Sequence, residues 1–282
     1  MATNSTRPEP HRHCPLCGQD NRRLPRSRFS RDGWQLKSCW QCELLYLENP
    51  PPVESLANEY NWSATSKIED QRRLDDHPTT AGLRSSWKRW WRRWLPRRKL
   101  ETLIHRYVVT GNVLDVGCGN GARFSGWPRS IVPHGIEIDA DAIEQARLRA
   151  EQRGGRVIHA DALTGLQGMV PAEMQGIVMH SFLEHDVRPL EVLKAAQRVL
   201  CDGGALIIKV PNFACWNRRY WHENDWPGFR FPDHVNYFTP RTLSHIIAKA
   251  GLRIRRFAWC DRLPTSDNMW VVAGKVPLVK RQ

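Results

Sequence analysis

A glycine-rich turn is the first segment of this 282-residue chain whose residue types and spacing suit chemistry. Residues 113–121 read VLDVGCGNG, and the apolar run predicts a buried strand that delivers Asp115 into a sharp turn. Gly117, Gly119 and Gly121 lack the Cβ atoms that would block a ligand, and they allow positive φ where the chain bends. The turn therefore predicts a nucleotide-like ligand, although the relaxed dinucleotide pattern G-x-G-x-x-A also fits it.

Acidic side chains stand on the next two predicted strands. Glu137 lies in the strand 136–139, where a carboxylate can accept hydrogen bonds from both ribose hydroxyls, as an acid also does in NAD enzymes. Asp161 follows the short strand 157–160 and suits an adenine amino group. Asp115 occupies a position where a dinucleotide fold usually has an apolar residue. It therefore favours S-adenosylmethionine, while a nicotinamide or flavin cofactor remains open at this point.

Two cysteine pairs near the N-terminus have the spacing of a metal site. The strings C-P-L-C and C-W-Q-C are separated by 21 residues, close to the spacing of four-cysteine zinc sites. Four sulfur ligands leave no open coordination position, so the pattern predicts a structural Zn²⁺, with iron–sulfur or redox chemistry as the alternatives. The predicted ligands are Cys14, Cys17, Cys39 and Cys42.

Three further strings occur in a fixed order. Residues 176–185 read GIVMHSFLEH, a predicted helix ends in RVL at residue 200, and residues 202–212 read DGGALIIKVPN. Together with the turn they resemble the class I S-adenosylmethionine-dependent methyltransferases of the small-molecule and glycan type, over about residues 100–276. The resemblance implies S-adenosylmethionine as cofactor. It also implies an α/β fold with a doubly wound, mostly parallel, seven-stranded Rossmann-like sheet whose seventh strand is antiparallel.

The same resemblance implies roles for individual residues. Asp115 and the three glycines of the turn would shape the methionine and ribose pocket, Glu137 would hold the ribose, and Asp161 the adenine. Gly176 stands where relatives often have an acid, so no carboxylate role is expected there. The full set of expected cofactor-binding residues is Asp115, Gly117, Cys118, Gly119, Gly121, Glu137, Ile138, Asp161, Ala162 and Ser181.

Two histidines are candidate catalytic residues. His185 follows the fourth predicted strand, at the mouth of the cofactor crevice of an open sheet. His234 lies in the aromatic loop 226–238, in a string P-x-H-x-x-x-F-T similar to one in many methyltransferases of this class, where the histidine faces the acceptor. Either could be the base that a hydroxyl acceptor needs, whereas helix capping or cofactor positioning is the alternative for His185. The inserted loop 213–238 predicts a lid or an acceptor wall.

Composition and length indicate one catalytic domain with N-terminal additions. We expect a zinc ribbon at 1–50, a linker at 51–82, a Trp/Arg-rich helix at 83–106 and the methyltransferase domain at 107–282. The ribbon, with LLYLENP after it, resembles a leader found on some bacterial sugar and glycan methyltransferases. No apolar run approaches the ~20 residues of a membrane span, and residues 1–9 are polar, so a cytoplasmic protein is expected. A net charge of +13 favours an anionic partner or surface, unless it is merely solvated.

The segment 85–99 predicts an amphipathic helix. Trp87, Trp90, Trp91 and Trp94 share one face at helical spacing, and lysine and arginine occupy the other. This helix can pack on the catalytic domain, or residues 84–99 can lie on an anionic membrane at its inner face, and the two are compatible. Nucleic-acid binding through phosphate contacts ranks below both.

The function predicted from these features is methyl transfer from S-adenosylmethionine to a hydroxyl or carbon. The acceptor would be a small-molecule or lipid-linked compound: a glycan, a lipid-linked glycan or an isoprenoid or quinone-type intermediate. One alternative is an RNA methyltransferase whose ribbon and basic helix hold the phosphate backbone. Another is a non-catalytic S-adenosylmethionine-binding interaction protein.

Overall fold

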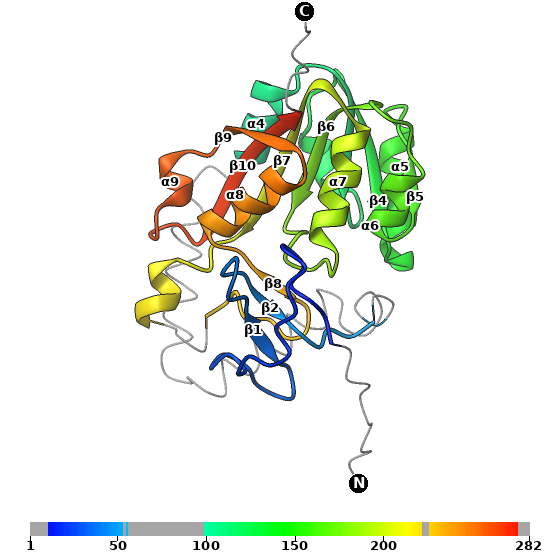
Figure 1. Ribbon diagram of the computed structural model, residues 1–282. Coiled ribbons are helices and arrows are strands. Elements are labelled where there is room, and N and C mark those ends of the chain that lie inside the picture. The colour runs from blue at the N-terminus through cyan, green and yellow to red at the C-terminus, as the bar shows by residue number, and fades with distance from the viewer. Residues whose placement is uncertain (1–10, 53–54, 56–98, 222–225, 276–282) are drawn as a thin grey trace, which may run out of the picture.

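A seven-stranded sheet forms the centre of the computed structural model, which describes residues 11–52, 55, 99–221 and 226–275 (Figure 1). The strand order is β5-β4-β3-β6-β7-β10-β9, and β10 runs antiparallel to both of its neighbours. The predicted doubly wound, mostly parallel Rossmann-like sheet is therefore confirmed. The strands are β3 (Gly111–Val116), β4 (Ile131–Glu137), β5 (Val157–His159), β6 (Met174–His180), β7 (Leu200–Pro211), β9 (Leu252–Arg256) and β10 (Asn268–Lys275).

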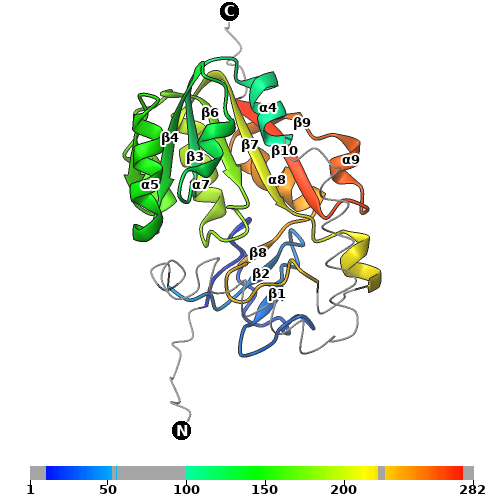
Figure 2. The same ribbon diagram turned by 180° about the vertical axis from the view of Figure 1, so that it is seen from behind.

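Helices cover both faces of this sheet because its strands are apolar on both sides. Neighbouring residues Val113 and Leu114 of β3 enter two different buried clusters, as strand geometry requires. One face is covered by α4 (Lys99–Tyr107), the 3₁₀ helix Ala122–Gly126 and α5 (Ala140–Glu151) (Figure 2). The other is covered by α6 (Ala162–Gln167), α7 (Pro189–Val199) and α8 (Pro240–Lys249). A short helix, α9 (Trp259–Arg262), precedes β10.

The part of the predicted Trp/Arg-rich helix that the structure describes is α4. Its side chains Leu100, Leu103 and Ile104 are buried against the sheet, so α4 packs as part of the large domain. The four tryptophans and most of the predicted linker lie outside the described residues. Within the described residues, no helix combines the length and apolar character needed to cross a bilayer.

The N-terminal cysteine-containing segment is joined to the domain of the seven-stranded sheet by a small second sheet. Strands β1 (Leu36–Ser38) and β2 (Leu45–Leu47) form a hairpin, and β8 (Asn236–Tyr237) pairs with β2 (Figure 1). Because β8 begins two residues after His234, this sheet connects the N-terminal segment to the loop that contains this candidate histidine. The two regions therefore share one structure rather than being joined only by a linker.

Arg12, in the N-terminal segment, stabilises the same junction by hydrogen bonds. Its guanidinium donates to the carbonyls of Leu47, Val187 and Val235 and to the side-chain oxygen of Asn236, at 2.8–3.2 Å. Burial lowers the pKa of Arg12 to about 10, which leaves it charged at neutral pH. Four acceptors from three segments of the chain thus depend on one side chain.

The loop between β7 and α8 buries its own aromatic rings. Phe229 and Phe231 stack at 6.0 Å, and Trp226 meets Phe229 edge-on. With Tyr237 they form a third buried cluster against β1 and β2. The prediction of an acceptor wall is wrong for these four rings, because they are fully used in packing the ribbon region onto the domain.

Replacing Arg12 tests this junction. Arg12→Gln removes most of the donors to these carbonyls, and we expect it to lower the free energy of unfolding by about 2–4 kcal/mol, because acceptors within the fold lose a charged donor. Arg22→Gln is the matched control, because Arg22 is exposed and pairs only with exposed groups. Its cost should stay within about 0.5 kcal/mol in the same urea titration. Equal effects of the two substitutions would contradict the structural role of Arg12.

Candidate cofactor and acceptor site

A cavity of about 150 Å³ lies at the carboxyl ends of β3, β4 and β5. Strand order reverses between β3 and β6, which is where open α/β sheets bind ligands. The cavity therefore occupies the position that the fold reserves for a nucleotide-like group. Its lining residues are Gly117, Ile136, Glu137, Ile138, Ala160, Asp161, Ala162, Phe182, His185, Asp186, Val187, Arg188 and Asp233.

The glycine-rich turn after β3 can contain no side chain at two of its positions. Gly117 has φ +72°, and a Cβ there would lie 2.9 Å from the Phe182 ring. Gly121 also has φ +72°, and a Cβ there would lie 3.0 Å from the backbone of Ala146. Both the backbone conformation and the close packing thus require glycine, which explains the pattern in the sequence.

Glu137 fixes the shape of this turn from the neighbouring strand. Its Oε2 accepts a hydrogen bond from the amide of Gly119 at 2.6 Å, and its Oε1 accepts from Ile138 and Asp139 at 2.9 Å. The carboxylate lines the cavity, and Oε2 still has a lone pair for a further donor. A ribose hydroxyl is a donor of this kind, so the position predicted for the ribose fits the group.

Asp115 lies behind the turn and does not line the cavity. Its Oδ2 accepts from Arg123 Nε at 3.0 Å, and Arg123 also donates to the carbonyl of Gly117. Oδ1 is buried and accepts no hydrogen bond within the described part of the chain. Burial raises the pKa of Asp115, while the Arg123 charge opposes this effect. Asp115 therefore supports the cavity through Arg123.

Asp161 lines the cavity and also begins a helix. Its carboxylate accepts from the amides of Leu163 and Thr164, and thereby caps the N-terminus of α6. It also pairs with Arg188 at 3.0 Å. Burial opposes ionisation of Asp161, but the hydrogen bonds from Thr164 and the Arg188 charge outweigh it and lower the pKa. The side chain predicted to bind adenine is thus ionised and lies at the cavity wall.

The other expected cofactor residues are divided between the cavity and its surroundings. Ile138 and Ala162 line it. The Cys118 side chain points into the core toward Gly135, so only the backbone of Cys118 can meet a ligand. Ser181 has φ +54° and accepts a hydrogen bond from Lys209 Nζ at 2.6 Å, outside the lining residues. His180 ends β6 with its ring against Trp270.

The two candidate histidines lie side by side at one end of the cavity. Their rings meet edge-on with centroids 4.6 Å apart, although only His185 lines the cavity. His185 Nδ1 contacts Asp233 Oδ1 at 2.6 Å, and Asp233 also pairs with Arg230. Burial opposes protonation of His185, but the Asp233 carboxylate outweighs it and raises the pKa. Burial and the neighbouring His185 hold the pKa of His234 well below its usual value.

Two charged residues, Asp233 and Arg188, are among those of the cavity wall that the sequence did not predict. Asp233 orients His185, and the only pointer to it in the sequence is its place directly before His234. Arg188 pairs with Asp161, and nothing in the local sequence marks it. Both contacts join segments that are far apart in the chain, so residue spacing could not have found them.

A larger groove of about 710 Å³ runs between the N-terminal segment and α7. It shares Val187 and Arg188 with the cavity but includes no strand end of the large sheet. Most of its wall comes from residues 11–18 and 50–52. The smaller cavity is therefore the site for chemistry, because the turn, the acidic residues and His185 all meet there.

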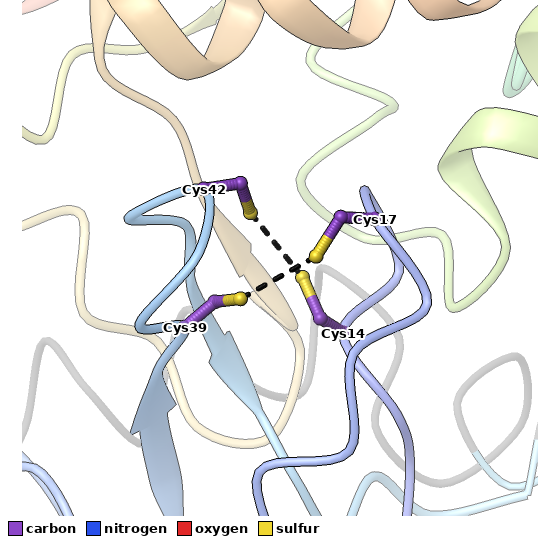
Figure 3. Close-up of side chains that lie close together, drawn as sticks. All are labelled: Cys14, Cys17, Cys39 and Cys42. Carbon is purple, nitrogen blue, oxygen red and sulfur yellow. Dashed lines mark hydrogen bonds between the residues drawn. The ribbon is translucent and has the colours of Figure 1, made fainter.

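The four cysteines of the N-terminal segment converge although they come from two separate turns (Figure 3). The Sγ atoms of Cys14 and Cys42 are 3.5 Å apart, and those of Cys17 and Cys39 are 3.4 Å apart. Sulfur atoms around a tetrahedral Zn²⁺ are about 3.8 Å apart, given Zn–S bonds of about 2.3 Å. The arrangement needs little adjustment to hold such an ion.

Comparison with known proteins identifies the domain to which this site belongs. The family model described as "Methyltransferase domain" matches residues 85–256. The ubiquinone biosynthesis O-methyltransferase of Xanthomonas campestris is 26% identical over 163 residues, 54% of this chain and 66% of the relative. That of Xanthomonas euvesicatoria matches at the same identity and coverage. The chain thus spans slightly less than two thirds of the length of these curated relatives.

Solved structures show the same fold at low identity. An S-adenosylmethionine-dependent methyltransferase from Clostridium acetobutylicum superposes with a TM-score of 0.52 at 10% identity, covering 69% of this chain and 98% of its own. A protein from Pyrococcus horikoshii gives a TM-score of 0.51 at 19% identity, with 64% and 89% coverage.

The packing of the glycine-rich turn is testable with two alanines. Gly154→Ala introduces a Cβ at φ +77° into open space, and its strain should lower the free energy of unfolding by about 1 kcal/mol. Gly117→Ala has the same strain and also meets the Phe182 ring, so we expect a further loss of about 1–2 kcal/mol. Urea unfolding of both variants measures the difference. Equal losses would show that the turn does not pack on Phe182.

Proposed function

The chain belongs to the methyltransferase domain family and has the Rossmann-like fold of class I S-adenosylmethionine-dependent methyltransferases, and from this premise we propose that it methylates a hydroxyl of a quinone-type aromatic acceptor. The observation on which the proposal depends is the cavity itself. At one end of the cavity lies the glycine-rich turn, which the Glu137 carboxylate holds by hydrogen bonds, and at the other end lies the His185–Asp233 pair. A cofactor site and a group able to activate a hydroxyl thus share one space.

The cofactor end fits S-adenosylmethionine by the chemistry of its donors and acceptors. Glu137 would accept from the ribose hydroxyls, and Asp161 with Ile138 and Ala162 would contact the adenine. Gly117 and Gly119 would let the rest of the ligand approach the backbone. When bound, the cofactor supplies an electrophilic methyl group on a sulfonium. The protein residues hold that group in place and exclude water from it.

The acceptor end must place an oxygen in line with the methyl group and help it lose a proton. A phenolic hydroxyl has a pKa near 10, so at neutral pH it needs assistance to become a good nucleophile. His185 lines the cavity and is oriented by Asp233, and His234 packs against it. We assign the activation of the acceptor hydroxyl to this histidine pair.

The quinone-type acceptor is supported by the curated relatives, which are ubiquinone biosynthesis O-methyltransferases. None of these relatives supports the glycan acceptors that the sequence suggested. The RNA and membrane alternatives depend on the tryptophans and arginines of the segment 85–98, which lies outside the described residues. No contact among the residues that the structure describes favours either alternative. A small aromatic diol is therefore the first acceptor class to test.

We also propose that Cys14, Cys17, Cys39 and Cys42 bind one structural Zn²⁺. The four sulfur atoms converge, and thiolates are the ligands of closed zinc sites. The N-terminal segment is short, and a metal would hold its two turns together. Through Arg12 and β8 the same metal would stiffen the loop that positions His234.

Cofactor binding is the first test of the proposed function. Glu137→Gln should weaken S-adenosylmethionine binding at least tenfold in calorimetry, because the amide offers only one acceptor oxygen to the turn and the ribose. Glu144→Gln is the control, because the Glu144 side chain is exposed on the outer side of α5, and this variant should bind the cofactor like the wild type. The wild type should methylate a dihydroxybenzene on oxygen and leave a saccharide unchanged. Tight NADH binding without binding of S-adenosylmethionine would refute the proposal.

The zinc site is tested by one cysteine in the cluster and one outside it. Cys39→Ser should lose the metal, measured as zinc per chain, and lower the melting temperature, because one ligand of a closed site is gone. Cys260→Ser is the control, since Cys260 is exposed on α9 and should alter neither value. Unchanged zinc content in Cys39→Ser would show that the metal is held elsewhere.

A further inference from the structure

Three groups with lone pairs converge at the acceptor end of the cavity. One ligand atom each from Glu184, His185 and His234 lies within 4.8 Å of the other two. Glu184 and His185 follow β6, whereas His234 comes from the loop before α8. The amides of Val235 and Asn236 both donate to the carbonyl of Glu184, and these bonds bring the two loops together.

Hydrogen bonds determine which nitrogen of each ring is available. The Nδ1 of His185 meets the Asp233 carboxylate, and that of His234 meets the carbonyl of Gly228 at 2.7 Å. An ionised carboxylate and a carbonyl can only accept, so both Nδ1 atoms donate. In each neutral ring this leaves a lone pair on Nε2.

Glu184 supplies the third lone pair from a position closed to solvent. The residue is 1% exposed, and its Oε2 accepts no hydrogen bond from any residue that the structure describes. Buried carboxylate oxygens normally have a donor, so an unpartnered one indicates a missing partner. With Glu184 ionised and both rings neutral, the cluster thus presents three lone pairs to one ion.

We propose that Glu184, His185 and His234 bind a divalent transition-metal ion. Two imidazoles and one carboxylate are the ligand set of open metal sites that keep positions for water or substrate. Histidine ligands of metals usually donate their other N–H to a carboxylate or a backbone carbonyl, and both arrangements occur here. Neighbouring ligand atoms of one ion are about 3.0–3.4 Å apart, given bonds of about 2.1 Å, so atoms within 4.8 Å of one another need to move closer by at most about 1.8 Å.

The position of this site gives the ion a role in the proposed reaction, and this part of the inference rests on the proposed function. His185 lines the cofactor cavity, so an ion bound to it would border the space where the acceptor hydroxyl must lie. A cation there would hold that oxygen and lower its pKa. An ion held there would take the Nε2 lone pair that a general base would use, so His185 would activate the hydroxyl as a ligand of the ion rather than as the base itself.

Cobalt uptake by the zinc-loaded protein tests the site. One molar equivalent of zinc per chain first fills the cysteine cluster, whose four thiolates bind zinc more tightly, and Co²⁺ is then followed by equilibrium dialysis and visible absorption. We expect one cobalt per chain, with a spectrum of nitrogen and oxygen ligands and without thiolate charge-transfer bands. Glu184→Gln and His234→Gln should each weaken this binding at least tenfold. Asp233→Asn should weaken it by about 10–100-fold, because Asp233 only orients a ligand.

A second group on the surface supplies the matched control. His11, His13 and Asp20 also lie close together, but His13 and Asp20 are exposed. His13→Gln should bind cobalt like the wild type. Circular dichroism and S-adenosylmethionine binding show whether Glu184→Gln remains folded, and His234→Gln provides a second variant if it does not.

Three results would overturn the proposed metal site. They are no cobalt uptake by the zinc-loaded wild type, wild-type affinity in folded Glu184→Gln, or loss of uptake in His13→Gln alone. Cobalt binding by a protein that fails to bind S-adenosylmethionine would refute the proposed function and leave the metal site intact. Methyl transfer without any cobalt uptake would refute the metal site and leave the proposed function intact.

Discussion

The candidate site depends on the backbone hydrogen bonds that join the loop after β6 to the loop before α8. Val235 and Asn236 donate to the carbonyl of Glu184, and the Asn236 side chain donates to the carbonyls of Leu183 and Asp186. This contact places Asp233 against His185 and brings His234 beside it. Without it the first loop would still follow a strand end at the cofactor crevice, but His185 would have no carboxylate to orient it. The acceptor end of the cavity therefore depends on the pairing of these two loops, whereas the cofactor end is built from residues at the carboxyl ends of β3, β4 and β5.

The N-terminal segment matters to the site because it supports the second of these loops. β8 pairs with β2, and Arg12 donates to the carbonyl of Val235 from the opposite side. The aromatic rings of the loop, which could have lined an acceptor pocket, instead fill the space between the two regions. A ribbon held by a metal would thus act on catalysis through rigidity, by keeping Asp233 and His234 in place. This explains why a segment with its own sheet and cysteine cluster is packed so closely against a catalytic domain.

The sequence was sufficient where local pattern determines structure. The apolar run before Gly117 and the glycines after it gave the strand, the turn and the fold, because positive φ and close packing leave no other residue type. It was insufficient where partners are distant. Asp233 reaches His185 across 48 positions, and Arg188 reaches Asp161 across 27. The side chain of Cys118 turned to the core because Gly135 leaves room for it there. The sequence did not show that the aromatic loop is buried, because β1 and β2, which cover it, come from a distant part of the chain.

The central claim is that the acceptor hydroxyl is activated at the His185 end of the cofactor cavity. The most direct measurement compares methyl transfer and cofactor binding in His185→Gln with those of the wild type, using a dihydroxybenzene acceptor. The account predicts that the rate constant for transfer falls by at least about a hundredfold while the affinity for S-adenosylmethionine changes less than about threefold. Transfer at the wild-type rate, with the cofactor still bound, would contradict it.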